Sequence, residues 1–224
     1  MANTSAANGF RQFRRMDGGA PTAGFDTLSI ISSDASIIFT GDPVITLSSV
    51  ANPGFGAPGG AGGYVTGTTA GNAQIRGIFL GCEYYSATVN RKVWSPYFPG
   101  NVQTSSGTND VTAWVCTDPD MTWLVQVSGS SVVGSTTSVV ASSQVGLNFG
   151  FSSNVIANGN TTTGISAVTL NATSGVTTNT LPFRLLDFYS NYAPPGVNGT
   201  DNTTSGQFVI VTANNWDRNQ LTGV

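Results

Sequence analysis

Histidine is absent from this chain of 224 residues, and charged side chains are scarce. Without histidine the chain lacks the commonest general base and proton shuttle, and also a frequent metal ligand. A Ser-His-Asp or Cys-His catalytic site is therefore excluded. The acidic residues are scattered, and the closest pair, Asp118 and Asp120, flanks a proline in a pattern typical of a turn. We therefore expect no enzyme activity, no catalytic residues, no cofactor and no bound metal.

Charged residues make up 8% of the chain, and its formal net charge is −3. An average protein has about 25% charged residues. The charges form no basic stripe of the kind that binds nucleic acid. No apolar run reaches the roughly 18 residues of a membrane-spanning helix, and the N-terminus lacks the pattern of a signal peptide. We expect neither a nucleic acid nor a membrane as a partner.

The two cysteines, Cys82 and Cys116, could form a disulfide only if their strands are neighbours. We favour two buried thiols, because unpaired cysteine behaves as a small apolar residue. Glu83, the only glutamate, follows Cys82 directly. We interpret Glu83 as half of an ion pair, with the partner open between Arg76, Arg91 and Arg184.

Short runs of β-branched and aromatic residues, separated by Gly, Pro, Asn and Asp, dominate the chain and are typical of β-strands. The richest stretch is 74–127, where a turn at 118–120 would join strands around Trp114 and Trp123 into a hairpin. No stretch has the apolar periodicity of an amphipathic helix. The other strand-like runs are 28–31, 37–40, 44–47, 145–151, 165–170, 181–189 and 208–212. The sequence predicts one all-β domain, a β-sandwich or β-barrel, over residues 26–224.

Residues 1–25 have a different composition and are predicted to form an extended N-terminal arm. Glycines flank a segment of phenylalanines and arginines that has no evident core to join. One interpretation is a disordered tail. The other is an arm that binds a partner, and since ordering the backbone costs about 1–2 kcal/mol per residue, it would bind as a strand added to a neighbour's sheet. On that interpretation the free arm is mobile, deletion of residues 1–16 leaves the domain folded, and the contacts come from Phe10, Arg11, Phe13, Arg14 and Arg15.

A second candidate surface is the aromatic segment 84–98. Such clusters form subunit interfaces or cores, and they also stack on sugars in lectin-like sites. With so little charge on the chain, we predict that this segment mediates self-association. The predicted interface residues are Tyr84, Tyr85, Trp94, Tyr97 and Phe98.

Several motifs, taken in their order along nearly the whole chain, resemble a family of small virion proteins of tailed bacteriophages, the capsid decoration or cement proteins. None of the motifs is specific alone, and the resemblance depends on their succession. They are Asn8–Arg11 with Gly18–Gly19 beyond, Gly41–Val44, Arg76–Tyr84, Trp94–Gly100, Asp118–Pro119, Gly159–Gly164, Phe183–Leu186 and Thr222–Val224.

The resemblance implies a structural protein that is made in the host cytoplasm and sits on the outer surface of the virion capsid. Its partner would be the major capsid protein of the phage head, which it would stabilise by binding the assembled shell. The family resemblance also implies a homotrimer. The alternative from the residues alone is a receptor- or glycan-binding β domain of a virion tail or fibre.

Overall fold

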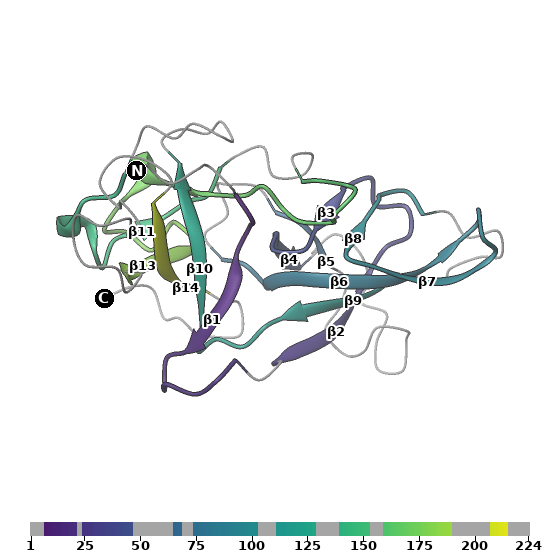
Figure 1. The fold of residues 1–224 in the computed structure, drawn as a ribbon, viewed down its shortest axis with the longest axis horizontal. Coiled ribbons are helices and arrows are strands. Elements are labelled where there is room, and N and C mark those ends of the chain that lie inside the picture. Colours follow the sequence, from purple (N-terminus) through teal and green to yellow (C-terminus); the bar gives the residue numbers. More distant parts are fainter. Residues whose placement is uncertain are drawn as a thin grey trace, which may run out of the picture.

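A computed structural model describes residues 7–21, 24–46, 65–68, 74–102, 111–128, 139–152, 159–189 and 207–214. These residues form β-strands and short 3-10 turns, as the sequence predicts, and the all-β class is confirmed (Figure 1). The sequence also predicts either short strands or a packed surface loop at 132–133 and 139–140; residues 132–133 lie outside the described ranges, and 139–140 form no strand. The strands are β1 (Arg11–Arg15), β2 (Phe25–Ile30), β3 (Ile38–Phe39), β4 (Pro43–Thr46), β5 (Val65–Gly67), β6 (Gly77–Ser86), β7 (Arg91–Ser95), β8 (Tyr97–Phe98), β9 (Val111–Cys116), β10 (Met121–Ser128), β11 (Asn148–Phe149), β12 (Leu170–Asn171), β13 (Phe183–Phe188) and β14 (Phe208–Ala213), with 3-10 turns η1 (Ser142–Gln144) and η3 (Ala172–Ser174).

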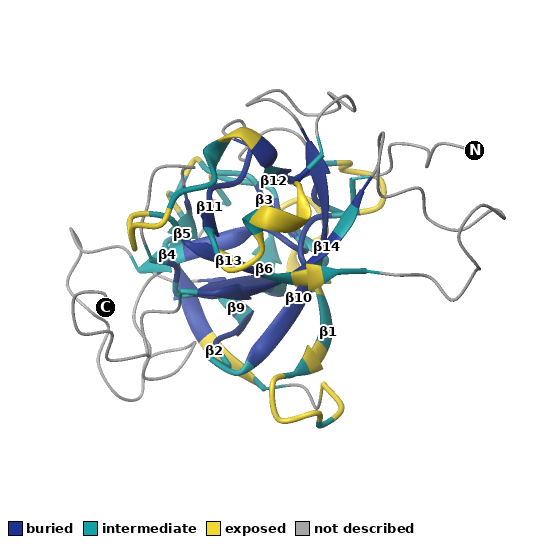
Figure 2. Ribbon diagram, turned by 90° about the vertical axis from the view of Figure 1, so that its left-hand side faces the viewer, coloured by how far each residue is buried: buried dark blue, intermediate teal, exposed yellow. Residues whose placement is uncertain are grey.

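Alternation of side chains is clearest in β9, whereas β10 is buried on both faces. In β9, Val111, Ala113 and Val115 are buried, whereas Thr112 and Trp114 are half-buried on the other face. Period-2 alternation of this kind lets one face of a strand enter a core. In Figure 2 the buried residues gather along the strands, and many of the exposed residues lie in the turns and 3-10 segments between them.

The first sheet has the strand order β1-β10-β14-β13-β11, and β12 also pairs with β10. Most pairs are antiparallel, but β12 runs parallel to the end of β10. An isolated bridge joins Phe151 to Leu170 of β12, and β11 lies just before Phe151. These bridges close the first sheet into a ring of paired segments around an apolar interior.

The second sheet has the order β2-β9-β6-β4-β5, with β7 paired to β6, and a two-stranded sheet of β3 and β8 accompanies it. In Figure 1 its long strands β6, β9 and β7 run across the view, whereas β10 and β14 of the first sheet stand upright. The two antiparallel sheets make a sandwich-like arrangement.

The predicted hairpin around residues 118–120 is wrong. β9 is hydrogen-bonded to β2 and β6, while β10 is hydrogen-bonded to β1 and β14. Both edges of each strand are therefore occupied by other partners. The turn between them carries the chain from the second sheet to the first.

Each sheet has its own buried cluster. Trp123, Phe149 and Phe183 belong to the cluster inside the first sheet, and Phe79 and Phe98 belong to the cluster under the second. Ile78 and Cys116 lie on strands of the second sheet but pack into the first cluster. Apolar contacts of these two residues therefore join the sheets.

The prediction that residues 9–16 have no core to join is wrong. Phe10 is 2% exposed, and its ring stacks on Phe183 with the centroids 4.1 Å apart. The residues that follow form β1, an antiparallel neighbour of β10 in the chain's own sheet. The backbone hydrogen bonds that we expected from a neighbouring subunit come from within the chain, so the domain begins before residue 26.

Phe10→Ala should therefore destabilise the protein by about 3–5 kcal/mol, because it leaves a cavity where a buried ring was. Phe25→Ala is the matched control. Phe25 is 45% exposed, and exposed positions usually change stability by about 0.5 kcal/mol or less. Urea unfolding followed by tryptophan fluorescence measures both changes. Deletion of residues 1–16 should destabilise more than Phe10→Ala, and equal stability of all three variants would contradict the placement of Phe10.

Candidate functional site

A buried carboxylate, that of Asp42, lies where several distant segments meet. Asp42 is 1% exposed. Its Oδ2 accepts a hydrogen bond from the backbone N–H of Phe39 at 2.7 Å, and its Oδ1 accepts one from the hydroxyl of Ser166 at 2.5 Å. The backbone of Asp42 continues this network, because its carbonyl accepts from the N–H of Phe79 on β6 at 2.9 Å. We call Phe39–Asp42 with these partners the Asp42 junction.

The N-terminal segment also packs against the Asp42 junction. The N–H of Phe10 donates to the carbonyl of Gly41 at 3.0 Å. Gly9 has a φ of +66°, and a Cβ there would lie 2.8 Å from Cβ of Ser166. Only glycine suits this position, because it tolerates the left-handed backbone and has no side chain to clash. The sequence shows Gly41-Asp42-Pro43 as a turn, but it gives no sign that this turn collects segments from the whole chain.

Burial raises the pKa of Asp42 to about 7, against the opposing effect of its hydrogen bonds to Ser166 and Phe39. A carboxylate this deeply enclosed is accessible to no substrate in this conformation. Its role in the structure is to hold the turn, β6 and the segment around Ser166 together.

The raised pKa makes the free energy of unfolding depend on pH. The folded protein keeps the proton of Asp42 up to about pH 7, whereas the unfolded chain loses it near pH 3.8. Stability from this group is therefore complete below about pH 4 and falls as the pH rises to about 7, by at most about 1.4 kcal/mol per pH unit. Urea unfolding across this range should show a steeper fall for the wild type than for Asp42→Asn. Asp34→Asn is the control, since Asp34 accepts a turn hydrogen bond nearer the solvent. Parallel curves for the wild type and Asp42→Asn would contradict the assignment.

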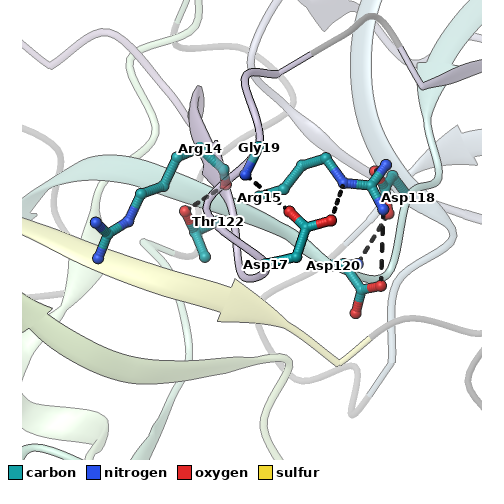
Figure 3. Close-up of polar contacts among 7 residues, drawn as sticks. All are labelled: Arg14, Arg15, Asp17, Gly19, Asp118, Asp120 and Thr122. Atoms are coloured by element: carbon teal, nitrogen blue, oxygen red, sulfur yellow. Dashed lines mark hydrogen bonds and ion pairs between the residues drawn. The ribbon is translucent and has the colours of Figure 1, made fainter.

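A second polar cluster surrounds Arg15 at the end of β1 (Figure 3). Its guanidinium lies 2.9 Å from Asp118, 3.4 Å from Asp17 and 3.9 Å from Asp120. The contact with Asp118 is an ion pair without hydrogen-bond alignment, because Asp118 Oδ2 has no hydrogen-bond partner among the described residues. Arg15, predicted as a partner-binding residue, is thus engaged within the chain, at the turn that links β9 to β10.

The other predicted arm residues are divided between the core and the surface. Phe10 is buried in the core, while the half-buried Phe13 makes an edge-to-face contact with Tyr189, at a centroid distance of 5.8 Å. Arg11 and Arg14 are exposed on β1, and the Arg14 guanidinium lies 5.6 Å from the centroid of Phe13. Of the five predicted arm residues, Arg11 and Arg14 are the two that stay exposed to a partner.

The predicted interface segment 84–98 is likewise only partly at the surface. Phe98 is fully buried in the second cluster and cannot serve as an interface residue, and Tyr97 stacks on Phe39 at 5.5 Å. Tyr84 packs against that same cluster, and the hydroxyl of Tyr85 donates to Asn90. Trp94 is the residue that fits the prediction, since it is 63% exposed.

Trp94 belongs to an outward face of the β6–β7 pair. Trp94 is the cross-strand partner of Glu83, and Lys92 is the partner of Tyr85. Because directly paired residues share a face, all four side chains lie on one side of the sheet. A Cβ on Gly81 would lie 3.4 Å from the Trp94 ring. The absence of a side chain there lets the indole lie close to the strand.

Glu83 forms its ion pair with Lys92, at 3.4 Å, so the predicted arginine partners are wrong. The pairing of β6 with β7 brings Lys92 beside Glu83, whereas the partner of Arg91 is Ser86. Both charged side chains are substantially exposed. Exposed pairs of this kind contribute about 0–1 kcal/mol.

Both cysteines are buried free thiols, as the sequence predicts. Their strands are neighbours, but Cys82 lies opposite Ala113 and Cys116 opposite Ile78, so the two sulfur atoms belong to different clusters. Burial raises the pKa of Cys82 to about 12 and also raises that of Cys116.

We therefore expect both thiols to be unreactive in the folded protein, because the thiolate is the nucleophile and neither thiol is accessible. An aromatic disulfide reagent should label neither cysteine at neutral pH without denaturant. In urea it should label both. Rapid labelling of Cys82 in the native protein, with Cys116 as the internal comparison, would contradict its burial.

The described part of the chain contains no group of three or more Cys, Asp and Glu side chains placed to hold a metal ion. Within the same ranges no helix has the length and apolar character to cross a membrane. Comparisons of the chain with protein-family models, curated proteins and solved structures find no match.

Proposed function

We propose that this protein is a structural virion protein that binds the outside of a phage head and stabilises the shell of the major capsid protein. The observation that carries the proposal is the ordered set of motifs along the chain. Five of these motifs meet at the Asp42 junction in the structure, including Asn8–Arg11, whose Phe10 N–H bonds the carbonyl of Gly41. Thr40 N–H bonds the carbonyls of Pro96 and Gly164, while Gly41 N–H bonds the carbonyl of Phe79 and Phe79 N–H bonds the carbonyl of Asp42.

The meeting of these motifs at one point of the fold supports the proposal. The residues on which the resemblance depends hold distant segments of the fold together. A protein with the same motifs in the same order is therefore expected to have the same fold. Decoration of a shell requires stable surfaces that bind in many copies rather than a reaction centre. The chain offers two such surfaces, the Trp94 face of β6–β7 and the arginines of β1.

The copy number in purified particles tests the proposal. Quantitative mass spectrometry of virions should find hundreds of copies per particle if the protein decorates the head, since a shell offers many equivalent sites. Electron microscopy with labelled protein should place these copies on the outer capsid surface. A handful of copies at the tail would overturn the decoration role and favour a receptor- or glycan-binding domain, for which the exposed Trp94 beside Glu83 and Lys92 is also suited.

We further propose that the protein forms homotrimers through the Trp94 face. Exposed tryptophans that become buried at an interface often contribute 2 kcal/mol or more to binding, roughly a 30-fold change in affinity. Trp94→Ser should therefore weaken self-association about tenfold or more, measured by cross-linking on particles and by analytical ultracentrifugation. Val145→Ser, at an apolar position 42% exposed on another part of the surface, is the control. A trimer that tolerates Trp94→Ser would exclude this face, and dimers or monomers on particles would exclude the trimer.

A further inference from the structure

A β-bulge in β1 places two arginines on one face of the first sheet. Arg11 lies opposite Leu124 and Arg14 lies opposite Thr122, and the register shifts between Gln12 and Arg14. In a regular strand, residues three apart point to opposite faces. The extra residue of the bulge, Phe13, brings Arg11 and Arg14 to the same side.

A third arginine shares this face. Pairing runs from Arg14 through Thr122 and Thr212 to Arg184 across four strands, β1, β10, β14 and β13. Both threonines are buried, and the hydroxyl of Thr212 donates weakly to the sulfur of Met16 at 3.9 Å. The arginines at the two ends of this row are exposed. We call this side of the sheet the arginine face.

The charges of the arginine face are unbalanced. A second bulge, between Leu185 and Asp187, puts Asp187 on the same side, in the row of Arg11. Among the described residues, neither Arg11 nor Arg14 forms an ion pair, whereas the next arginine, Arg15, contacts three carboxylates. Figure 3 shows Arg14 pointing away from the cluster that neutralises Arg15. In a chain with a net charge of −3, the part that the structure describes has three arginines and one aspartate on this face, which makes it locally basic.

The strand that carries Arg11 and Arg14 is also a sheet edge. Within the described ranges β1 has a single neighbouring strand, β10. An edge strand presents backbone N–H and C=O groups to which another extended chain can bind. Beyond Arg15 this edge is closed by the chain's own turn, where Arg15 N–H bonds Gly19 O and Gly18 N–H bonds Arg15 O. The available edge is therefore a short stretch beside Arg11 and Arg14, and it does not include the Arg14 carbonyl, which accepts from the Thr122 hydroxyl of β10 at 2.6 Å.

We propose that β1 binds an extended acidic segment of a partner protein, which adds as a strand to this edge and places its carboxylates against Arg11 and Arg14. Backbone hydrogen bonds would supply affinity, and charge complementarity would select the partner. Guanidinium groups pair with carboxylates in a planar, two-point geometry that suits this recognition. The inference rests on the proposed function only in identifying the partner as the major capsid protein.

A nucleic acid is the less favoured occupant. Its affinity comes from many phosphates neutralised together, and the arginine face supplies few cations. Asp187 on β13, and Asp17 and Asp120 in the turns after β1 and before β10, are exposed or half-exposed and would repel a long phosphate backbone. The edge of a strand, by contrast, offers backbone N–H and C=O groups that can hydrogen-bond to a peptide backbone.

Fluorescence anisotropy with the full-length protein tests the proposal. The probe is a labelled peptide of about six residues that alternates glutamate and valine, the length of an average strand. Arg11→Glu with Arg14→Glu should weaken binding about tenfold or more, and added salt should weaken wild-type binding. Arg91→Glu with Thr88→Glu and Val89→Glu lowers the net charge by the same four units at exposed positions of β7 and the turn before it, at residues outside the Trp94 face, and should change binding less than about twofold. Circular dichroism and urea unfolding check that all variants are folded.

A second peptide, N-methylated so that it cannot donate backbone hydrogen bonds, separates strand addition from charge alone and should bind at least about tenfold more weakly. Equal loss in both charge-reversal variants, no peptide binding at low salt, or tight binding of the N-methylated peptide would overturn the proposal. Duplex DNA bound more tightly than the peptide, and lost on Arg11→Glu with Arg14→Glu, would overturn the partner class. Absence of the protein from phage heads would refute the decoration role. The anisotropy measurements with the peptide would still decide whether β1 binds an acidic strand.

Discussion

The fold depends on one enclosed carboxylate. Asp42 binds the backbone of its own turn and the hydroxyl of Ser166, while the adjoining backbone binds β6 and the N-terminal segment at Phe10. An unpaired polar group in this position would cost about 1–3 kcal/mol, so the loss of any one partner should destabilise the turn. One short turn thereby fixes the relative positions of segments more than 100 residues apart in the chain.

The two sheets are also joined where the chain crosses between them. β1 lies beside β10 in the first sheet, and β2 lies beside β9 in the second, so the segments that leave β1 and β9 meet between the sheets. The N–H of Met16 bonds the carbonyl of Asp120 at 2.8 Å, and the hydroxyl of Thr117 bonds Asp26 at 2.6 Å. Arg15 and its carboxylates lie at this crossing, and their partial burial strengthens the contact relative to an exposed pair.

Because the chain has few charged residues, it matters which of them stabilise the fold and which stay exposed for binding. Most acidic groups of the described chain have a structural task, as in the Arg15 cluster and the Asp42 junction. Among the described residues Arg11 and Arg14 form no ion pair, and the indole of Trp94 is largely exposed. A protein whose function is to bind other proteins would do so through exposed side chains that do not stabilise its own fold. Those side chains lie on different sheets, which allows one surface for a partner and another for a second copy of the chain.

The sequence by itself determined the all-β class, the buried thiols and most of the strands, because alternation of apolar residues is a local property that decides which face of a strand is buried. It also indicated the turn at residues 118–120. Only the tertiary structure decided which strands pair, since alternation says nothing about which edges meet. Trp114 and Trp123 therefore belong to different sheets despite their proximity in sequence. The sequence around Phe10 likewise does not indicate that this residue is buried. The ring that covers it, Phe183, is far from it in the sequence.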